Sequence, residues 1–483
     1  MDHNTENSNT SNSNTSINAE FQKKLQQLLT DLQLDDAPAG GAVAVYQAGQ
    51  CIAQASTGMA RPDMPWQPDT LAINFSTGKG VLATLVHVLV SQQLLEYDKP
   101  IAHYWPEFAA NGKDQITLRQ VMSHQADLFS IQSIDVDSEM VLDWDTMLSH
   151  IAAMPITSPE DAPKYDSAYS ALVYGWILGG LVEAVTNLPF AAALRQYLTE
   201  PLGIADSCYF GVPDSKVDQV AKLAKDFEET EDTSSQLKSR RQKPTLKVDS
   251  QETLRTYASL PSYHCWQQKM INDKRAAETQ SSFDDSLDEN LDSPDIDNVK
   301  PVLNTARINS LYFNTSQLNL KNYKAALIPA GKHALDYYNR QTLQAVIPAA
   351  NGVASAKALA TIYAMLANGG VWQGKTLIDS ATFEQLSTPQ VEGLDAVMPA
   401  AMKWRLGYHR LFSLYANNDD TDKRMSPALS GFGHMGYNGS VAWCDPERQL
   451  SFAFIHNFDT TMLNDVRQFA LTEAVLSWVE EIL

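Results

Sequence analysis

Cysteine is scarce in this chain, and none of it is spaced for a metal ion or a redox pair. The four cysteines among 483 residues are Cys51, Cys208, Cys265 and Cys444, which lie far apart. That spacing argues against a disulfide framework and against a zinc site, and it is typical of a reducing compartment. A His-Glu-x-x-His cluster is also missing, so we expect no metal and no cofactor.

Basic residues are outnumbered as well. The chain holds 36 Lys and Arg against 57 Asp and Glu, a formal net charge of -21. This balance argues against nucleic acid and anionic membranes as partners. The N-terminus lacks the basic and apolar regions of a secretory signal, and no apolar run is long enough to span a bilayer. We therefore expect a cytoplasmic protein with a small-molecule substrate, no nucleic-acid partner and no membrane partner. Its oligomeric state stays open.

Apolar residues are depleted in two segments. Residues 1–17 are rich in Asn, Ser and Thr, which predicts a disordered tail. Residues 213–324 contain a basic island at 238–243 and an acidic stretch at 278–297, which predicts an insertion with a disordered middle. We expect parts such as Tyr263–Trp266 to pack on the body. A tolerated surface insertion is favoured over a regulatory or partner-binding one.

Strand patterns occur near both ends of the chain, with helical patterns between them. The predicted strands are residues 41–46, 51–56, 406–412, 439–444 and 449–456. The prediction is an α/β (α+β) fold in which one antiparallel sheet is formed from both termini, flanked by helices, with an inserted mainly helical domain. The α/β part would comprise 18–98 and 325–483, and the helical part 99–212.

The stretch from Asn74 to Val90 carries the candidate chemistry. Ser76 and Lys79 form a Ser-x-x-Lys pair at the head of an apolar helix predicted to reach about Leu95. Residues three apart share a helix face, so the hydroxyl and the amine can meet. A lysine kept partly neutral by burial can take the serine proton and make it a nucleophile for acyl transfer.

The motif alone proves little, because the chain holds a second copy. Ser235 and Lys238 have the same spacing inside the low-order insertion, with no apolar helix after them. Only the copy at Ser76 heads a helix that is apolar nearly all round and should be buried.

Other segments offer partners for Ser76. Tyr169 stands near Ala171 at the start of an apolar helix, and a nearby lysine would lower the phenol pKa, making Tyr169 a base or proton shuttle. His434 opens a His-Met-Gly element before a predicted strand pair. Gly436 would let the backbone approach a reacting carbonyl, and the N–H of Tyr437 could form an oxyanion hole with that of Ser76. For His124 we favour a structural role.

In this order the motifs resemble the serine β-lactamase-like superfamily (class C β-lactamase fold), and within it the family VIII carboxylesterases. The resemblance covers about 20–212 and 325–483. The matching segments are Phe75–Gly80, Leu95–Ile101, Tyr104–Phe108, Ser123–Ala126, Tyr169–Trp176, Pro201–Gly203, Asn351–Ala354, Gly433–Gly436, Gly439–Ser440 and Asp445–Pro446.

The resemblance implies an acylated nucleophile at Ser76, acid and base duties shared by Lys79 and Tyr169, and His434 at the position of the Lys-Thr-Gly lysine. Two substrate-side positions depart from the β-lactamases. Ala171 replaces the Asn of Tyr-x-Asn, and His434 replaces the lysine that helps bind the lactam carboxylate. Both favour a carboxylesterase acting on small esters. The alternatives are a β-lactamase or D-Ala-D-Ala peptidase of this fold, and a non-catalytic scaffold.

Overall fold

A six-stranded antiparallel sheet lies at the centre of the computed structural model, which describes residues 7–33, 38–227, 249–281, 302–330, 335–414 and 430–482. Its strands, in spatial order, are β10 (His409–Arg410), β11 (Phe432–Met435), β12 (Val441–Asp445), β13 (Leu450–His456), β1 (Gly41–Gln47) and β2 (Gln50–Thr57). The first strand pairs with the last, in a register that runs from Gly41↔His456 to Gln47↔Leu450. The predicted sheet built from both termini is therefore confirmed.

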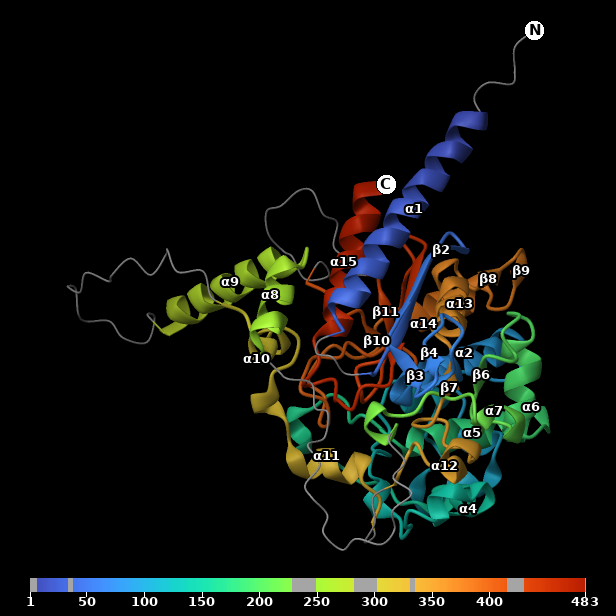
Figure 1. Ribbon diagram of the computed structural model, residues 1–483. Coiled ribbons are helices and arrows are strands. Elements are labelled where there is room, and N and C mark those ends of the chain that lie inside the picture. Colours follow the sequence, from blue (N-terminus) through green and yellow to red (C-terminus); the bar gives the residue numbers. More distant parts are fainter. Residues whose placement is uncertain are drawn as a thin grey trace, which may run out of the picture.

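Helices cover both faces of this sheet. Along β1, Val43 and Val45 join the apolar cluster of α1 (Asn7–Asp31) and α15 (Arg467–Ile482), two helices that run side by side (Figure 1). Ala42 and Ala44 face the other way, into the cluster that contains α2 (Gly78–Ser91) and α13 (Ala356–Ala367). Successive side chains on a strand point to opposite faces, so β1 is buried on both sides and reads as a continuous apolar run.

The first helix begins earlier than expected. It starts at Asn7, so residues 7–17 of the predicted disordered tail are helical, while residues 1–6 lie outside the described part. Its C-terminal half is anchored on the sheet and on α15, where Phe21 meets Trp478 edge to face at 5.8 Å. Once a helix is nucleated, each added residue gains one backbone hydrogen bond, so a docked half can extend a polar half.

Helices dominate the segment between the two halves of the sheet. They are α3 (Leu118–Met122), α4 (Trp144–Ala153), α5 (Val173–Thr186), α6 (Phe190–Leu194), α7 (Asp214–Val217), α8 (Gln251–Ser259), α9 (Tyr263–Ser281), α10 (Thr305–Ser310), α11 (Leu320–Leu327), α12 (Arg340–Gln344) and, beyond α13, α14 (Ser380–Ser387). Short strand pairs complete the fold: β3 (Met59–Arg61) with β4 (Met64–Pro65), β5 (Ala72–Ile73) and β6 (Cys208–Tyr209) on β7 (Val353–Ala354), and β8 (Val371–Trp372) with β9 (Lys375–Thr376).

Two elements are shorter than predicted. The helix after Ser76 ends at Ser91 rather than near Leu95, because Gln93 adopts a left-handed backbone with φ of 63°. The strand predicted over 406–412 is reduced to His409–Arg410, since Gly407 has φ of 84° and interrupts the extended chain. In both cases a single positive-φ residue ends the regular backbone.

The insertion contributes folded helices. Trp266 is fully buried and donates its indole N–H to Tyr312 at 2.8 Å, and Tyr312 stacks on Phe469 of α15 at 3.8 Å. This segment packs on the body as predicted. The expected disordered middle and the second copy, Ser235 and Lys238, lie outside the described residues.

Within the described ranges, no single helix is both long and apolar enough to cross a membrane. One bent pair, Val173–Thr186 with Phe190–Thr199, meets the length and composition criteria only when its two helices, 77° apart, are taken together.

Candidate active site

Ser76 sits on a single 3-10 turn, η1 (Phe75–Thr77), immediately before the buried helix α2. Phe75 holds a left-handed backbone with φ of 49°, an unusual conformation for a bulky residue. Its ring packs edge to face on Tyr337 at 5.4 Å, and the preceding Asn74 N–H donates to the Gly352 carbonyl at 2.8 Å. Strained turns of this kind persist only where neighbours fix them, and they cluster at functional sites.

Lys79 is fully buried and lies directly behind the hydroxyl of Ser76. Its Nζ is 2.9 Å from Ser76 Oγ and 2.7 Å from each of the carbonyl oxygens of Ala171 and Ala349. Burial lowers the pKa of Lys79 well below its ordinary value, which favours the neutral amine. A neutral amine has two hydrogens and one lone pair. The two carbonyls can only accept, so they take the hydrogens, and the lone pair is left to accept the Ser76 hydroxyl proton.

Tyr169 lies on the other side of the nucleophile, and its titration differs from the expectation. Burial raises the pKa of the Tyr169 phenol, while its hydrogen bond with Ser76 pulls the pKa the opposite way and does not prevail. The predicted lowering of this pKa is therefore wrong. Burial is the largest influence on this phenol, and Lys79, whose Nζ lies 5.0 Å from the ring centroid, does not bring its pKa below the ordinary value. A protonated phenol beside a neutral amine can donate a proton but is not itself a base.

The orientation of Tyr169 depends on residues that carry no sequence motif. Its ring stacks on Trp404 at 5.4 Å with an interplanar angle of 8°. The buried Asp395 accepts from the Tyr169 backbone N–H at 3.3 Å and from the Trp404 indole N–H at 3.0 Å. His124 accepts from the Ser170 N–H at 3.2 Å, which is the structural role we expected of it.

His434, on β11, is buried and carries one unused ring nitrogen. Its Nδ1 lies 2.9 Å from the carbonyl oxygen of Met435, so Nδ1 must bear the hydrogen. Burial, followed by the neighbouring His409 and Lys79, lowers the pKa of His434 well below its ordinary value. The ring is therefore neutral, and Nε2 presents a lone pair that no group among the described residues engages. His434 can accept a hydrogen bond from a bound molecule.

The end of β11 lies against the turn that carries Ser76. A Cβ added to Gly436 would be 2.4 Å from the backbone oxygen of Asn74, so only glycine permits this approach. Thr77 Oγ1 also donates to the Ser440 carbonyl at 3.0 Å. The backbone N–H groups of Ser76 and Tyr437 thus come from adjoining segments, and neither has an acceptor within the part of the chain that the structure describes.

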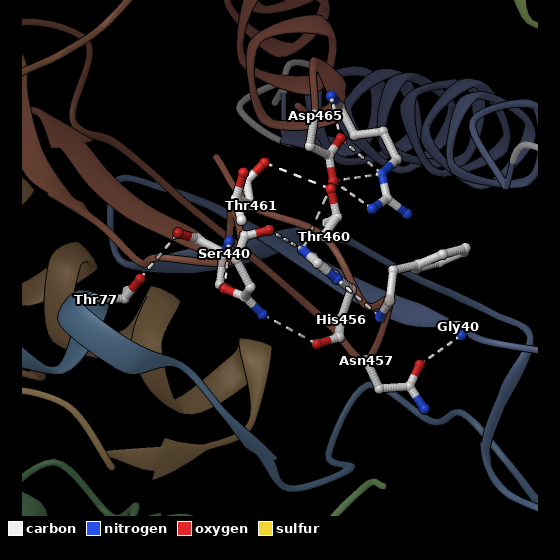
Figure 2. Close-up of polar contacts among 11 residues, drawn as sticks. Gly40, Thr77, Ser440, His456, Asn457, Thr460, Thr461 and Asp465 are labelled. Carbon is white, nitrogen blue, oxygen red and sulfur yellow. Dashed lines mark hydrogen bonds and ion pairs between the residues drawn. The ribbon is translucent and has the colours of Figure 1, made fainter. Parts of the chain in front are cut away.

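A buried polar network braces the turn after Gly436 (Figure 2). His456 Nε2 donates to the Asn438 carbonyl at 3.0 Å, and its Nδ1 accepts from the Phe458 N–H at 3.1 Å. The Met462 N–H binds the Tyr437 carbonyl at 2.8 Å. The last sheet strand and the segment after it therefore hold the backbone of Tyr437 and Asn438 in place.

The catalytic-type residues that the sequence singled out are thus brought together around one serine. Residues 21–476 match the family model described as Beta-lactamase. The chain belongs to the beta-lactamase family.

Relatives within this family include esterases. The chain is 28% identical over 421 residues to the esterase/beta-lactamase LipL of Mycobacterium tuberculosis, covering 86% of this chain and 77% of that protein. It is 27% identical over 186 residues to the esterase EstB of Burkholderia gladioli, covering 34% of this chain and 46% of that protein.

Solved structures share the fold over nearly the whole length. A penicillin-binding protein homolog from Caulobacter crescentus superposes with a TM-score of 0.64 and 26% identity, covering 94% of this chain and 96% of that one. A family VIII carboxylesterase gives a TM-score of 0.64 at 22% identity, covering 96% and 97%. The resemblance drawn from the motifs is therefore confirmed, and this beta-lactamase-family chain has the fold of a hydrolase.

Two cavities meet at Ser76 in this beta-lactamase-family site. The larger, about 520 Å³, is called here the chamber; it is mostly apolar and aromatic, with Ala171 at its wall. The smaller, about 30 Å³, lies between Tyr169, His434 and Trp404. The insertion supplies part of both walls through Tyr323 on α11, and Leu327, at the end of the same helix and just past the insertion, also lines both cavities, so the insertion is more than a surface addition.

Some functional groups could not be found from the sequence. The Ala349 carbonyl and the Asp395 carboxylate are placed by tertiary structure, and neither lies in a motif. Among the described residues, no group of three or more His, Cys, Asp and Glu side chains is placed to hold a metal ion.

Proposed function

We propose that this beta-lactamase-family hydrolase is a carboxylesterase that acts through an acyl-enzyme on Ser76. The observation that carries the proposal is the buried amine of Lys79, 2.9 Å from Ser76 Oγ, with both hydrogens committed to backbone carbonyls. An amine held this way has a lone pair directed at the nucleophile, and its burial, which lowers its pKa, favours the neutral form.

Acylation then follows from the placement of each group. Lys79 takes the proton of Ser76 as its Oγ attacks the ester carbonyl, and the developing oxyanion is stabilised by the N–H groups of Ser76 and Tyr437. Tyr169 gives its proton to the departing alkoxide and is reprotonated from Lys79. Water then cleaves the acyl-enzyme, returning one proton to Ser76 and releasing the carboxylic acid.

The neutral form of His434 favours esters over penicillins. In β-lactamases a lysine at this position helps bind the substrate carboxylate, whereas a neutral imidazole offers no positive charge. Ala171 likewise supplies only its backbone oxygen, which Lys79 already occupies. Turnover of nitrocefin or a D-Ala-D-Ala peptide faster than of short esters would support the β-lactamase or peptidase alternative instead.

The decisive test removes the hydroxyl of Ser76. We expect Ser76→Ala to abolish hydrolysis of methyl butyrate, followed by pH-stat titration, and labelling by a fluorophosphonate probe. Ser235→Ala, in the second Ser-x-x-Lys copy, is the matched control and should keep both. Wild-type hydrolysis by Ser76→Ala would overturn the proposal, and a wild-type protein that is never labelled at Ser76 would indicate a non-catalytic scaffold.

A further inference from the structure

The two cavities at Ser76 differ greatly in size, and both are lined mainly by apolar side chains. The chamber, about 520 Å³, is within the usual range of small-molecule sites, roughly 300–1,000 Å³. The small cavity, about 30 Å³, matches the volume of roughly one water molecule in the liquid. Both are lined by Ser76 and Tyr437, so an ester carbonyl at the nucleophile has one substituent on each side.

The position of Tyr169 decides which side receives the leaving alcohol. Tyr169 lines the small cavity and is absent from the lining of the chamber. Lys79 lines neither cavity, and once it has taken the Ser76 proton, two of its three hydrogens are held by the carbonyls of Ala171 and Ala349 while the third can pass to Tyr169. The departing alkoxide must take its proton from a group that it can reach, which places it beside Tyr169.

His434 supplies an independent reason to assign the small cavity to a molecule of this size. Its Nε2 is buried, lacks a partner among the described residues, and belongs to a side chain that lines this cavity. A buried acceptor without a partner is costly unless a bound molecule satisfies it. The water that attacks the acyl-enzyme approaches from where the alcohol left, and this lone pair can hold it there.

The chamber is much larger than the small cavity. Its wall is formed largely by aromatic and aliphatic side chains, among them Phe75, Leu335, Tyr337, Tyr338 and Phe458. Apolar surface of this kind gains free energy in proportion to the apolar area that a ligand removes from water. A long or branched hydrocarbon group fits here and has no room on the other side of Ser76.

We propose that the enzyme hydrolyses esters of a bulky apolar carboxylic acid with a very small alcohol such as methanol, the acyl group lying in the chamber and the alkoxy group in the small cavity. In the acylation step the bond between Ser76 Oγ and the carbonyl carbon forms and the bond to the alkoxy oxygen breaks. The proton lost by Ser76 ends on the alcohol through Lys79 and Tyr169. This inference rests on the proposed esterase activity.

Two isomeric esters test the orientation directly. Methyl octanoate and heptyl acetate have the same formula and differ only in which side of the ester is long. We expect kcat/KM, followed by pH-stat titration, to favour methyl octanoate on the order of tenfold or more, since each methylene in a fitting pocket contributes. Equal rates, or faster hydrolysis of heptyl acetate with Ser76 still required, would overturn the orientation and leave the esterase proposal standing.

The failure of the underlying activity has a separate signature. If methyl acetate and both isomers are not hydrolysed and the fluorophosphonate probe does not label Ser76, the proposed function fails and this inference fails with it. If methyl acetate is hydrolysed but methyl octanoate is not, only the acyl assignment of the chamber is overturned.

Two variants change one cavity each. Each is assessed by the ratio of its kcat/KM for methyl octanoate to that for heptyl acetate, because a loss of folded protein lowers both rates equally and leaves this ratio unchanged. Met402 lines the small cavity and not the chamber, so Met402→Ala enlarges the small cavity only. This variant should raise the rate for heptyl acetate relative to that for methyl octanoate. Leu335 lines the chamber and not the small cavity, so Leu335→Trp fills part of the chamber only. This variant should lower the rate for methyl octanoate relative to that for heptyl acetate. An unchanged ratio in both variants would contradict the assignment of the two cavities.

Discussion

In the mechanism that we propose, burial lets Lys79 and Tyr169 divide the proton transfers. In water an amine is charged and a phenol is neutral near pH 7. Removing both from water disfavours the charged form of each, so the pKa of Lys79 falls and that of Tyr169 rises. The result is a pair of uncharged groups on either side of Ser76, one with a free lone pair and one with a proton to give.

The charge state of Lys79 makes a prediction about stability. Its pKa is lowered in the folded protein, so between that pKa and the ordinary value of 10.5 the unfolded chain binds one proton more than the folded chain. The contribution of Lys79 to stability therefore grows as pH rises, by about 1.4 kcal/mol per pH unit. Denaturant unfolding between pH 8 and 9.5 should show the free energy of wild type increasing by that slope relative to Lys79→Met.

Lys79→Met is the appropriate comparison because the hydrogen bonds it loses are independent of pH. Parallel curves for the two proteins would mean that Lys79 is charged in the folded state. The same titration predicts that kcat/KM falls on the acid side, where the ammonium form has no lone pair for the Ser76 proton.

At the scale of single residues, the sequence identifies the functional side chains of the site but not the backbone carbonyls that act with them. A sequence motif is a pattern of side chains, and this is why it identified Ser76, Lys79, Tyr169 and His434. The Ala349 oxygen that helps keep Lys79 neutral is a backbone atom, and any residue type would supply it. The direction of the Tyr169 shift was missed because it depends on how much water is excluded, which spacing does not encode.

At the scale of elements, the junction between β11 and η1 positions the two backbone N–H groups that we propose as oxyanion donors. Gly436, directly after β11, has no side chain, and this allows the backbone of Asn74 to approach. The turn after Gly436 is fixed by the hydrogen bond from His456 to the Asn438 carbonyl (Figure 2). Tyr437 thus presents its N–H from a segment with little freedom to move, as preorganised electrostatic stabilisation requires.

Substituting the glycine tests this junction. In Gly436→Ala the new methyl group would lie 2.4 Å from Asn74 O and 3.1 Å from Thr77 Oγ1, forcing β11 away from the serine turn. We expect kcat to fall about 100-fold or more, as when one oxyanion donor is lost, with the fold retained. Steady-state kinetics and circular dichroism measure the two effects.

Gly203→Ala provides the comparison. Nothing lies within 4 Å of its added methyl group, although its φ of 72° makes alanine less stable there. That variant should lose some thermal stability and keep its kcat. Full activity of Gly436→Ala would show that the Tyr437 N–H is not an oxyanion donor.

Elements with a strong local pattern were predictable, and those ended by tertiary contacts were not. The hairpin of β1 and β2 lies where the strand pattern placed it. The end of α2 depended on the left-handed Gln93, and the shortness of β10 on Gly407. Propensity does not encode which residue of a long apolar run will adopt that conformation.

At the scale of the whole molecule, α1 closes one face of the central sheet. Among the described side chains, five apolar ones are buried on α1 or directly after it, namely Phe21, Leu25, Leu28, Leu29 and Leu32. Each such burial stabilises by roughly 1.5–3 kcal/mol, so together they contribute on the order of 10 kcal/mol, comparable to the stability of a typical domain.

Two truncations should therefore behave very differently. A chain that begins at residue 18 keeps all five apolar side chains, and we expect it to stay folded and active. A chain that begins at residue 34 exposes the sheet face lined by Val43 and Val45, and we expect it to aggregate or unfold. Thermal melts and size-exclusion chromatography distinguish the outcomes, and a stable, active chain from residue 34 would contradict the role given to α1.

The pairing of β1 with β13 also determines when activity can arise during synthesis. Gly40 and Asn457, which join the two ends of the chain, are 417 positions apart, and Thr77 and Ser440, which join the nucleophile turn to the oxyanion segment, are 363 apart. A ribosome must release nearly the entire polypeptide before these contacts can form. Such distant pairings form slowly, and until β13 is synthesised the edge of β1 that it will pair with remains unpaired. Under the proposed function, Ser76 therefore cannot hydrolyse esters until nearly all of the chain has been synthesised.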